Sequence, residues 1–299
     1  MQVATLNAAG RGCRDGPLTQ ALFSTPSHCA CDAGGIVYVA DQENHRIRKI
    51  APDSDVSTIA GDGVAGYQDG PGAVARFLHP TGVAVDASGY VFVCDANHCV
   101  RLITPEGDVS TLAGSGRPGV GDGQGADARF CHPVGIAVDI WGDVFVADTG
   151  NHRIRKITPL GVVTTIAGTG AASSADAPGA PGTSSGFNQP TGIAVDREGN
   201  IFVSELEARR IRQISREAGV STLAGGGGAG AGAGGFRDGV AADARFDSPC
   251  GIAVDGDGNV FVADFGNHRI RRITPDGAVM TVAGRGLHSS TPQLNLSRF

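Results

Sequence analysis

Short apolar runs alternate with polar turns along this chain, and the same four runs recur through most of its length. The first run has the form Gly-Ile-Ala-Val-Asp and the second the form Val-Phe-Val-Ala-Asp, both of strand length and rich in β-branched residues. The third reads Arg-Ile-Arg-Lys-Ile and the fourth Val-Ser-Thr-Ile-Ala-Gly. Turns that contain Asp, Gly and Asn separate the runs, as tight hairpins require. The pattern therefore predicts four antiparallel strands per unit.

An eight-residue motif, Asp-x-x-Asn-His-Arg-Ile-Arg, marks the turn between the second and third runs. It stands at 41–48, 148–155 and 264–271, and degenerate copies stand at 95–101 and 205–212. Successive copies begin 53 to 59 residues apart, which indicates a repeat array. Repeats of four antiparallel strands are typical of β-propeller blades.

On these residues the chain resembles the NHL repeat family of β-propellers. The resemblance rests on the Asn-His-Arg-Ile core, the Gly-Ile-Ala-Val-Asp run and the closing Ala-Gly, and it covers nearly the whole chain. It implies an all-β propeller of four-stranded antiparallel blades, in a single domain over residues 1–299. We expect a partial repeat over about 1–26 and full repeats over about 27–79, 80–132, 133–189, 190–248 and 249–299.

The two ends of the sequence bear on the number of blades. Residues Val3 to Leu6, with Ala9 to Gly12 after them, resemble a fourth run, so the chain holds six fourth runs and five of each other run. The last residues, Leu296 to Phe299, resemble the Ala-Arg-Phe segment that opens a repeat. We therefore expect five complete blades and an orphan N-terminal strand. NHL propellers commonly have six blades, so we interpret the chain as part of a six-bladed array.

Charge and cysteine content narrow the class of protein. The net charge of −6 argues against a general binder of polyanions. The seven cysteines form no regular framework, which favours free thiols in a reducing compartment and hence an intracellular location. We find no N-terminal run that resembles a signal peptide and no apolar stretch of membrane-spanning length, and we expect no membrane partner.

The repeated polar residues raise the question of a metal. His45, His98, His152 and His268 each follow an aspartate of the same motif. Equivalent positions in successive blades lie about a blade width apart, whereas zinc ligands must all lie within about 2.0 to 2.1 Å of one ion. We interpret Asp and Asn as caps of the turn and His as packing between blades. The aspartates that end the first runs are explained by Asx turns. We therefore expect no cofactor and no bound metal.

One candidate site precedes the first run of each repeat, in a recurring Phe-x-x-Pro segment. Its third position varies where the flanking Phe and Pro do not, and it reads Thr25, His79, His132, Gln189 and Ser248. These side chains are expected at the rim of a central channel, where propellers usually bind ligands. The two histidines could help to hold a metal or a substrate. This site would belong to an alternative function, a channel-centred metal-dependent enzyme of the lyase or lactonase type.

A second candidate site is the turn of the fourth repeat. It reads Glu205-Leu-Glu207-Ala-Arg209-Arg210, so it loses the Asn of the motif and gains two acidic residues beside two arginines. One interpretation is a charged spot for one particular partner, which makes Glu205, Glu207, Arg209 and Arg210 a candidate binding site. The alternative is a drifted repeat whose surface charges pair with one another and contribute little to stability.

The resemblance also implies RNA binding as an alternative function, as in tripartite-motif NHL proteins. Against it, the third-run arginines repeat as structural residues would, and aromatic residues for base stacking make up only 5% of the chain. A fold hosts many functions, so the family alone does not decide. We expect a noncatalytic propeller that acts as a protein-interaction scaffold, with a protein as its partner.

Overall fold

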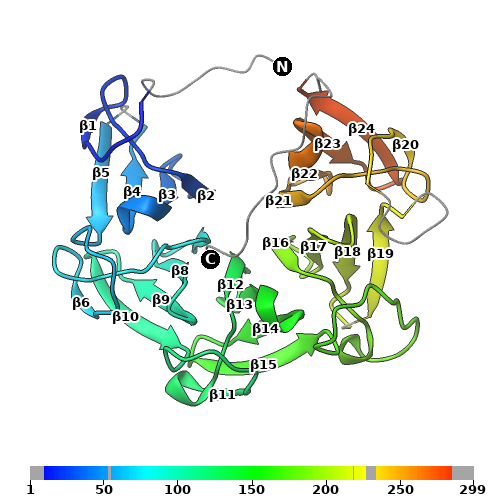
Figure 1. Ribbon diagram of the computed structural model, residues 1–299, viewed down its shortest axis with the longest axis horizontal. Helices are drawn as coiled ribbons and strands as arrows, with labels where there is room; N and C mark the ends of the chain where they lie inside the picture. The colour runs from blue at the N-terminus through cyan, green and yellow to red at the C-terminus, as the bar shows by residue number, and fades with distance from the viewer. Residues whose placement is uncertain (1–9, 53–54, 218, 227–233, 285–299) are drawn as a thin grey trace. The chain divides into compact units, whose positions relative to one another are not determined.

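The computed structural model describes residues 10–52, 55–217, 219–226 and 234–284. These residues form strands and short 3₁₀ helices that build a β-propeller of five blades. None of the helices in the described chain has the length and hydrophobicity needed to cross a bilayer. The predicted β-propeller fold is therefore confirmed at the level of its blades (Figure 1).

Each blade contains the four strands that the four apolar runs predict. The strands are β2 (Pro26–Cys31), β3 (Val37–Asp41), β4 (Arg46–Ile50) and β5 (Asp55–Ala60) in blade one; β7 (Val83–Val85), β8 (Val91–Asp95), β9 (Cys99–Ile103) and β10 (Asp108–Ala113) in blade two; β12 (Pro133–Val138), β13 (Val144–Asp148), β14 (Arg153–Ile157) and β15 (Val162–Ala167) in blade three; β16 (Pro190–Val195), β17 (Ile201–Glu205), β18 (Arg210–Ile214) and β19 (Val220–Ala224) in blade four; and β21 (Pro249–Val254), β22 (Val260–Asp264), β23 (Arg269–Ile273) and β24 (Ala278–Ala283) in blade five.

Short elements complete the blades. Two-residue strands from the connecting segments pair antiparallel with the last strand of blades one, two, three and five: β1 (Gly16–Pro17), β6 (Gly70–Pro71), β11 (Gly123–Gln124) and β20 (Gly239–Val240). The 3₁₀ helices are η1 (Gln42–Asn44), η2 (Gly125–Asp127), η3 (Thr149–Asn151), η4 (Gly182–Ser184) and η5 (Phe265–Asn267). The sequence pattern did not predict these edge strands, because a two-residue segment that begins with Gly in a polar stretch is typical of a loop.

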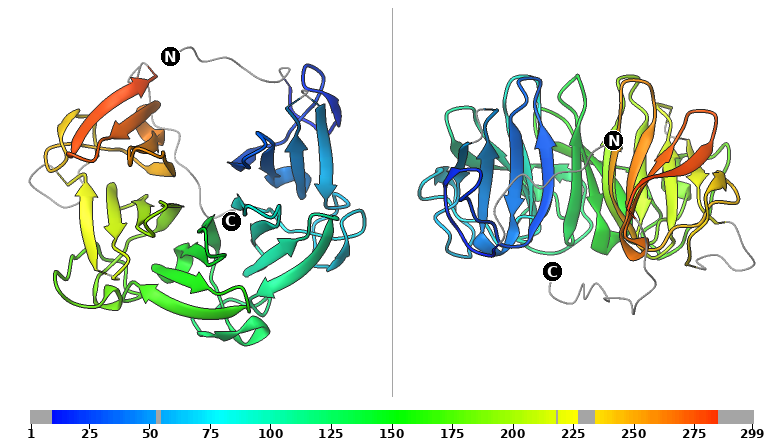
Figure 2. Two further views of the ribbon diagram at one scale, coloured as in Figure 1. Left: turned by 180° about the vertical axis from the view of Figure 1, so that it is seen from behind. Right: turned by 90° about the horizontal axis from the view of Figure 1, so that it is seen from above.

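Within each blade the main strands follow one another in sequence order and run antiparallel, as the first blade shows in the side view of Figure 2. The pairing slips by one residue between the third and fourth strands of several blades, at Ile47/Arg48 in blade one and at Ile270/Arg271 in blade five. This bulge lies beside the repeated arginine of the third strand. It twists the blade locally, as bulges do.

The number of blades corrects one expectation. The described residues build the five complete blades that the sequence predicts, and the expected six-bladed array is wrong for this structure. The reason is the count of strand runs, because only the fourth run occurs a sixth time. That extra copy, Val3 to Leu6, and the segment Leu296 to Phe299 lie outside the described residues, so the orphan strand remains a prediction.

Contacts group the chain into two compact units. One consists of Gln2–Val146 and Ile157–Thr164, and the other contains Ala147–Lys156 and Thr165–Phe299. The strands of blade three are divided between the two units. The first unit therefore holds blades one and two, the second holds blades four and five, and each unit has its own apolar core.

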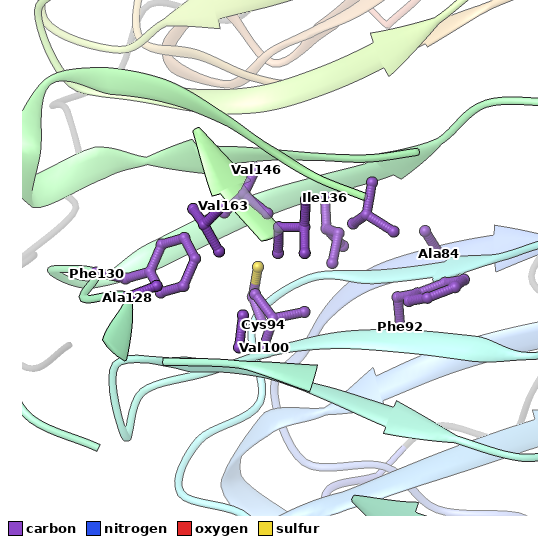
Figure 3. Packing of buried hydrophobic residues seen from close by; sticks show 12 residues of the cluster. Ala84, Phe92, Cys94, Val100, Ala128, Phe130, Ile136, Val146 and Val163 are labelled. Carbon is purple, nitrogen blue, oxygen red and sulfur yellow. The ribbon is translucent and has the colours of Figure 1, made fainter. Parts of the chain in front are cut away.

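The core forms where one blade packs against the next. In the first unit, Ala128 and Phe130 of the segment ahead of β12 pack onto Cys94 and Val100 of blade two, with Val163 completing the cluster (Figure 3). The second unit repeats the arrangement, with Ala244 and Phe246 packed onto blade four. Each such Phe is fully buried, and burying a Phe side chain contributes about 1.5–3 kcal/mol. The recurring Ala-x-Phe segment thus holds consecutive blades together.

Candidate binding site

A buried ion pair stands at the turn between the second and third strands of every blade. The carboxylate ends the second strand and the guanidinium lies seven residues later, or six in blade two. The pairs are Asp41–Arg48 at 2.8 Å, Asp95–Arg101 at 3.1 Å, Asp148–Arg155 at 2.7 Å, Glu205–Arg212 at 3.0 Å and Asp264–Arg271 at 2.7 Å, and all ten side chains are fully buried. Glu205 thus takes the place of the repeated Asp.

The rest of the buried Arg48 guanidinium is also bonded inside the blade. Arg48 donates to the main-chain carbonyls of Arg14 and Leu22 and pairs with a second carboxylate, Asp15, at 2.5 Å. Its guanidinium carbon lies 4.9 Å from the ring centroid of Phe23, in a cation–π contact. Arg101, Arg212 and Arg271 repeat the second carboxylate and the Phe contact. These repeated arginines are structural and form no basic surface for RNA.

The aspartate of the motif joins three segments of its blade. One oxygen of Asp41 accepts the N–H of Ser24, ahead of the first strand, and the other accepts from Arg48 and from the Asn44 side chain. Asp41 forms no side-chain cap on η1, and the same holds for the equivalent aspartates at η3 and η5. The expected capping role of this Asp is therefore wrong for these three turns.

The aspartates that end the first strands form the expected Asx turns. Asp86 accepts the N–H groups of Ser88 and Tyr90, and Asp255 accepts those of Asp257 and Asn259. Asp32, Asp139 and Asp196 accept main-chain N–H groups in the same way. A local role in the hairpin explains all five carboxylates.

The histidine of the motif bonds to the next blade, which confirms that it packs between blades. His45 Nδ1 accepts the N–H of His79 at 3.1 Å, and His98 Nδ1 accepts the N–H of His132 at 3.2 Å. Burial lowers the pKa of His45 and His98, and the neighbouring ring of His79 or His132 lowers each pKa further. The neutral imidazole that accepts the N–H is thereby favoured over the charged form.

The four candidate residues ahead of the first strands, His79, His132, Gln189 and Ser248, all have left-handed backbone, with φ between 43° and 51°. The rings of His79 and His132 lie edge-on against His45 and His98, with centroids 4.6 and 4.7 Å apart. Over the described residues, no three His, Cys, Asp or Glu side chains gather as a metal site would require. The structure thus pairs each candidate histidine with the preceding blade.

The turn of blade four separates the four charged residues that the sequence groups together. Glu205 is fully buried against Arg212, and burial raises its pKa. Arg209 takes the place of the motif histidine and pairs with Asp247 at 3.3 Å, while Arg210 donates to the carbonyl of Ser174 at 3.1 Å. Glu207 is exposed. The drifted-repeat interpretation has these charges pair with one another, whereas Glu205 pairs with Arg212, Arg209 with Asp247 and Arg210 with the Ser174 carbonyl.

A cavity of about 500 Å³ opens beside this turn, within the second unit. It is lined by Ser173, Ser174, Ala175, Asp176, Asn188, Glu207, Ala208 and Arg210. Its walls are thus the turn itself and the connecting segment ahead of blade four. The sequence drew attention to the charges of the turn and missed Ala208 and the serines, whose importance depends on contacts between distant segments.

Comparisons with known proteins agree with the repeat. The family model of the NHL repeat matches residues 130–157 and 246–273. The chain is 29% identical to Protein SUPPRESSOR OF QUENCHING 1, chloroplastic, of Arabidopsis thaliana, over 76% of this chain and 23% of the relative. It is 28% identical to NHL repeat-containing protein 2 of Bos taurus, over 83% of this chain and 38% of the relative. The chain therefore spans well under half the length of these relatives.

Solved structures show the same fold at low identity. An auxiliary nutrient binding protein from Bacteroides thetaiotaomicron aligns with a TM-score of 0.66 at 16% identity, over 93% of this chain and 61% of that one. A chain of the nidogen/laminin complex aligns at 0.60 and 15% identity, over 89% and 81%. A gluconolactonase from Xanthomonas campestris aligns at 0.59 and 16% identity, over 88% and 76%.

Proposed function

Because this chain belongs to the NHL-repeat β-propellers, we propose that it is a noncatalytic platform that binds a partner protein at the turn of blade four. The supporting observation is the cavity beside residues 205–210, at the turn that departs most from the repeat. At the other turns the repeated polar side chains bond within the blades or between them. Among these turns, the one in blade four therefore has the polar side chains that differ most from the repeat.

The comparisons leave the function open. The fold neighbours include a gluconolactonase and a chain of the nidogen/laminin complex, so the same fold serves both catalysis and assembly with another protein. The proposed surface does not include His79, His132, Gln189 or Ser248. The main-chain N–H of the first three already donates a hydrogen bond to a histidine of the preceding blade.

Exchange of the blade-four turn tests the proposal. Residues 205–210 are replaced by the turn of blade three, Asp148 to Arg153, which the same fold already accommodates. Tagged wild-type and exchanged proteins are cross-linked in cells of the source organism, and the captured proteins are compared by quantitative mass spectrometry. We expect a partner at near-equal amount with the wild type and a loss of at least about tenfold on exchange, as the removal of a binding hot spot gives.

The matched control exchanges the turn of blade one, Asp41 to Arg46, for the same blade-three turn, and it is expected to retain the partner. Capture that survives the blade-four exchange would contradict the proposal, and so would turnover of a small-molecule substrate by the purified protein.

A further inference from the structure

Consecutive blades meet through two faces that differ from each other. The trailing face of a blade consists of its motif histidine and four apolar side chains, which in blade one are Tyr38, Ala40, Ile47 and Ala60. The leading face of the next blade consists of the left-handed residue, the proline after it and the first strand, which in blade two are His79, Pro80 and β7. The two faces share one apolar cluster, and His45 accepts the N–H of His79. One blade thus covers the face of the blade before it.

The trailing face of blade five is open. Ile270 is 41% exposed, whereas its counterparts in the other blades are fully buried: Ile47, Val100, Ile154 and Ile211. Phe261, Ala263 and Ala283 of the same face are only partly buried, although the equivalent side chains of blades one to four are buried. His268 is exposed and, within the described part of the chain, accepts no N–H of a following blade, unlike the motif histidines of blades one to three.

The leading face of blade one is open as well. Cys29 of β2 is exposed, whereas the apolar residues at its position are at most 9% exposed: Val83, Ile136, Ile193 and Ile252. Pro26 is exposed, while the corresponding prolines of the other four blades are buried. Thr25 has the left-handed backbone of its counterparts, with φ of 52°, and its side chain is also exposed. Among the described residues, no trailing face covers blade one.

We propose that the trailing face of blade five binds the leading face of blade one in a second copy of this chain. The junctions within the chain show that these two kinds of face fit each other, by apolar packing and by an N–H···Nδ1 hydrogen bond. In the contact between copies, the N–H of Thr25 donates to Nδ1 of His268, as the N–H of His79 donates to His45. This contact is separate from the partner site proposed at the turn of blade four.

The two faces are complementary, because each carries what the other needs. The trailing face offers a histidine acceptor among apolar side chains, and the leading face offers a main-chain N–H beside a proline. Two trailing faces would place one Nδ1 acceptor against another, so a symmetric pair through blade five does not form this bond. The contact is therefore heterologous, and each added copy leaves one face of either kind free for the next copy. Burial of the exposed apolar side chains favours the association.

Two single variants of the full chain and their mixture test the contact by sedimentation velocity. Ile270→Asp places a charge on the trailing face and Cys29→Asp places one on the leading face, and both side chains are exposed, so the variants are expected to fold. We expect the wild type to associate as its concentration rises, and each variant to associate at least about tenfold more weakly. An equimolar mixture of the two variants should form a dimer and nothing larger, because it retains one intact face of each kind.

A matched control and a second readout locate the contact. Ile140→Asp alters a side chain that is 70% exposed in the turn between β12 and β13 and belongs to neither face, so this variant should associate like the wild type. Alkylation by iodoacetamide, followed thiol by thiol by mass spectrometry, should modify Cys29 in the dilute protein and lose this reaction on association. Cys13 is exposed outside both faces and should react equally in the two conditions. Circular dichroism checks that each variant is folded.

A chain that stays monomeric at every concentration would overturn the inference, and so would association that folded Ile270→Asp protein retains in full. A mixture of the two variants that forms no dimer would also overturn it, because the copies would then use other surfaces. Association that appears only in Phe299→Ala would assign the face of blade five to the segment Leu296 to Phe299, which lies outside the described residues, and would exclude the second copy. Partner capture at the turn of blade four is measured separately and depends on none of these outcomes.

Discussion

At the scale of single residues, the buried arginine of each blade is the least expected feature. A run such as Arg-Ile-Arg-Lys-Ile predicts a strand with its charges in water, yet Arg48 is fully buried. Burial of a charge is costly unless ion pairs and hydrogen bonds compensate it. The sequence holds one hint of that compensation, an aspartate seven residues upstream in three of the motif copies. The Phe contacts and the second carboxylates come from distant segments, so the motif alone could not reveal them.

Removal of one such guanidinium is expected to lower the free energy of unfolding strongly. Arg271→Gln leaves Asp238 and the buried Asp264 without their partner, and loss of one member of a buried pair typically costs about 3–5 kcal/mol. Urea unfolding followed by circular dichroism measures the change. The neighbouring Arg272, which is partly buried and contacts Met280, is the control. Arg272→Gln should cost less than about 1 kcal/mol, and equal losses for the two variants would show that burial of the pair is not decisive.

The histidines between blades make stability depend on pH. Burial lowers the pKa of His45 and His98 in the folded chain, whereas an unfolded histidine titrates near about 6.5. As the pH falls below that value, the unfolded chain takes up protons that the folded chain resists. The stabilising contribution is therefore present above the unfolded pKa and is lost as the pH falls toward the folded pKa.

We expect the urea midpoint to fall less steeply between about pH 7 and pH 5 in His45→Asn/His98→Asn than in the wild type. Asn tolerates the left-handed backbone of both positions, where φ is 53° and 60°. Asp95 acts in the opposite sense, because burial raises its pKa to about 6 and the folded chain gains stability as the pH falls through that value. Both proteins share Asp95, so the difference isolates the histidines. Identical slopes would argue against the lowered pKa values.

At the scale of elements, the sequence predicted the main strands well, because a period of two and fixed turn residues specify a hairpin locally. Close approach of one blade to the next is harder to predict, since it depends on backbone from another repeat. Gly192 at the start of β16 illustrates it: a Cβ there would lie 2.0 Å from the carbonyl oxygen of Cys250. Gly251, at the same position of β21, would meet nothing closer than the Ala263 Cβ at 3.6 Å.

These two glycines should respond differently to the same change. Gly192→Ala forces β16 and β21 apart and is expected to cost at least about 1–3 kcal/mol, as over-packing does. Gly251→Ala should be neutral, or stabilising by about 0.4–1 kcal/mol, because it restricts the unfolded chain. Thermal unfolding of the two variants side by side measures the contrast. Similar melting temperatures would mean that the blades accommodate the added methyl group without a loss of stability.

At the scale of the whole molecule, the repeat made the β-propeller and its five complete blades predictable, whereas the expected six-bladed array was wrong and the partner stays a prediction. The array was expected because one strand run, Val3 to Leu6, occurs without the three others that a blade needs. The cavity of blade four could not be predicted, because its walls come both from the turn of residues 205–210 and from a segment some 35 residues away (208 − 173). Neither effect leaves a pattern within a single repeat.

The metal-enzyme alternative has a direct test. We expect the purified chain to carry far less than one equivalent of zinc or any other transition metal by mass spectrometry, and its melting temperature to be unchanged by EDTA. A catalytic metal bound to the folded state would raise that temperature by mass action. His79→Ala/His132→Ala should leave the metal content unaltered. Stoichiometric metal that disappears in this double variant would overturn the platform and restore the enzyme.

Ala208 stands where the motif of the other four blades has Asn, and this single difference shows how a repeat protein can change during evolution. Blades one, two and five use that Asn to tie the connecting segment to the second strand, whereas blade four forms its four strands without it. One repeat can therefore lose an internal side chain while the other repeats keep theirs. Each blade has its own strands, so the fold persists while a single blade diverges.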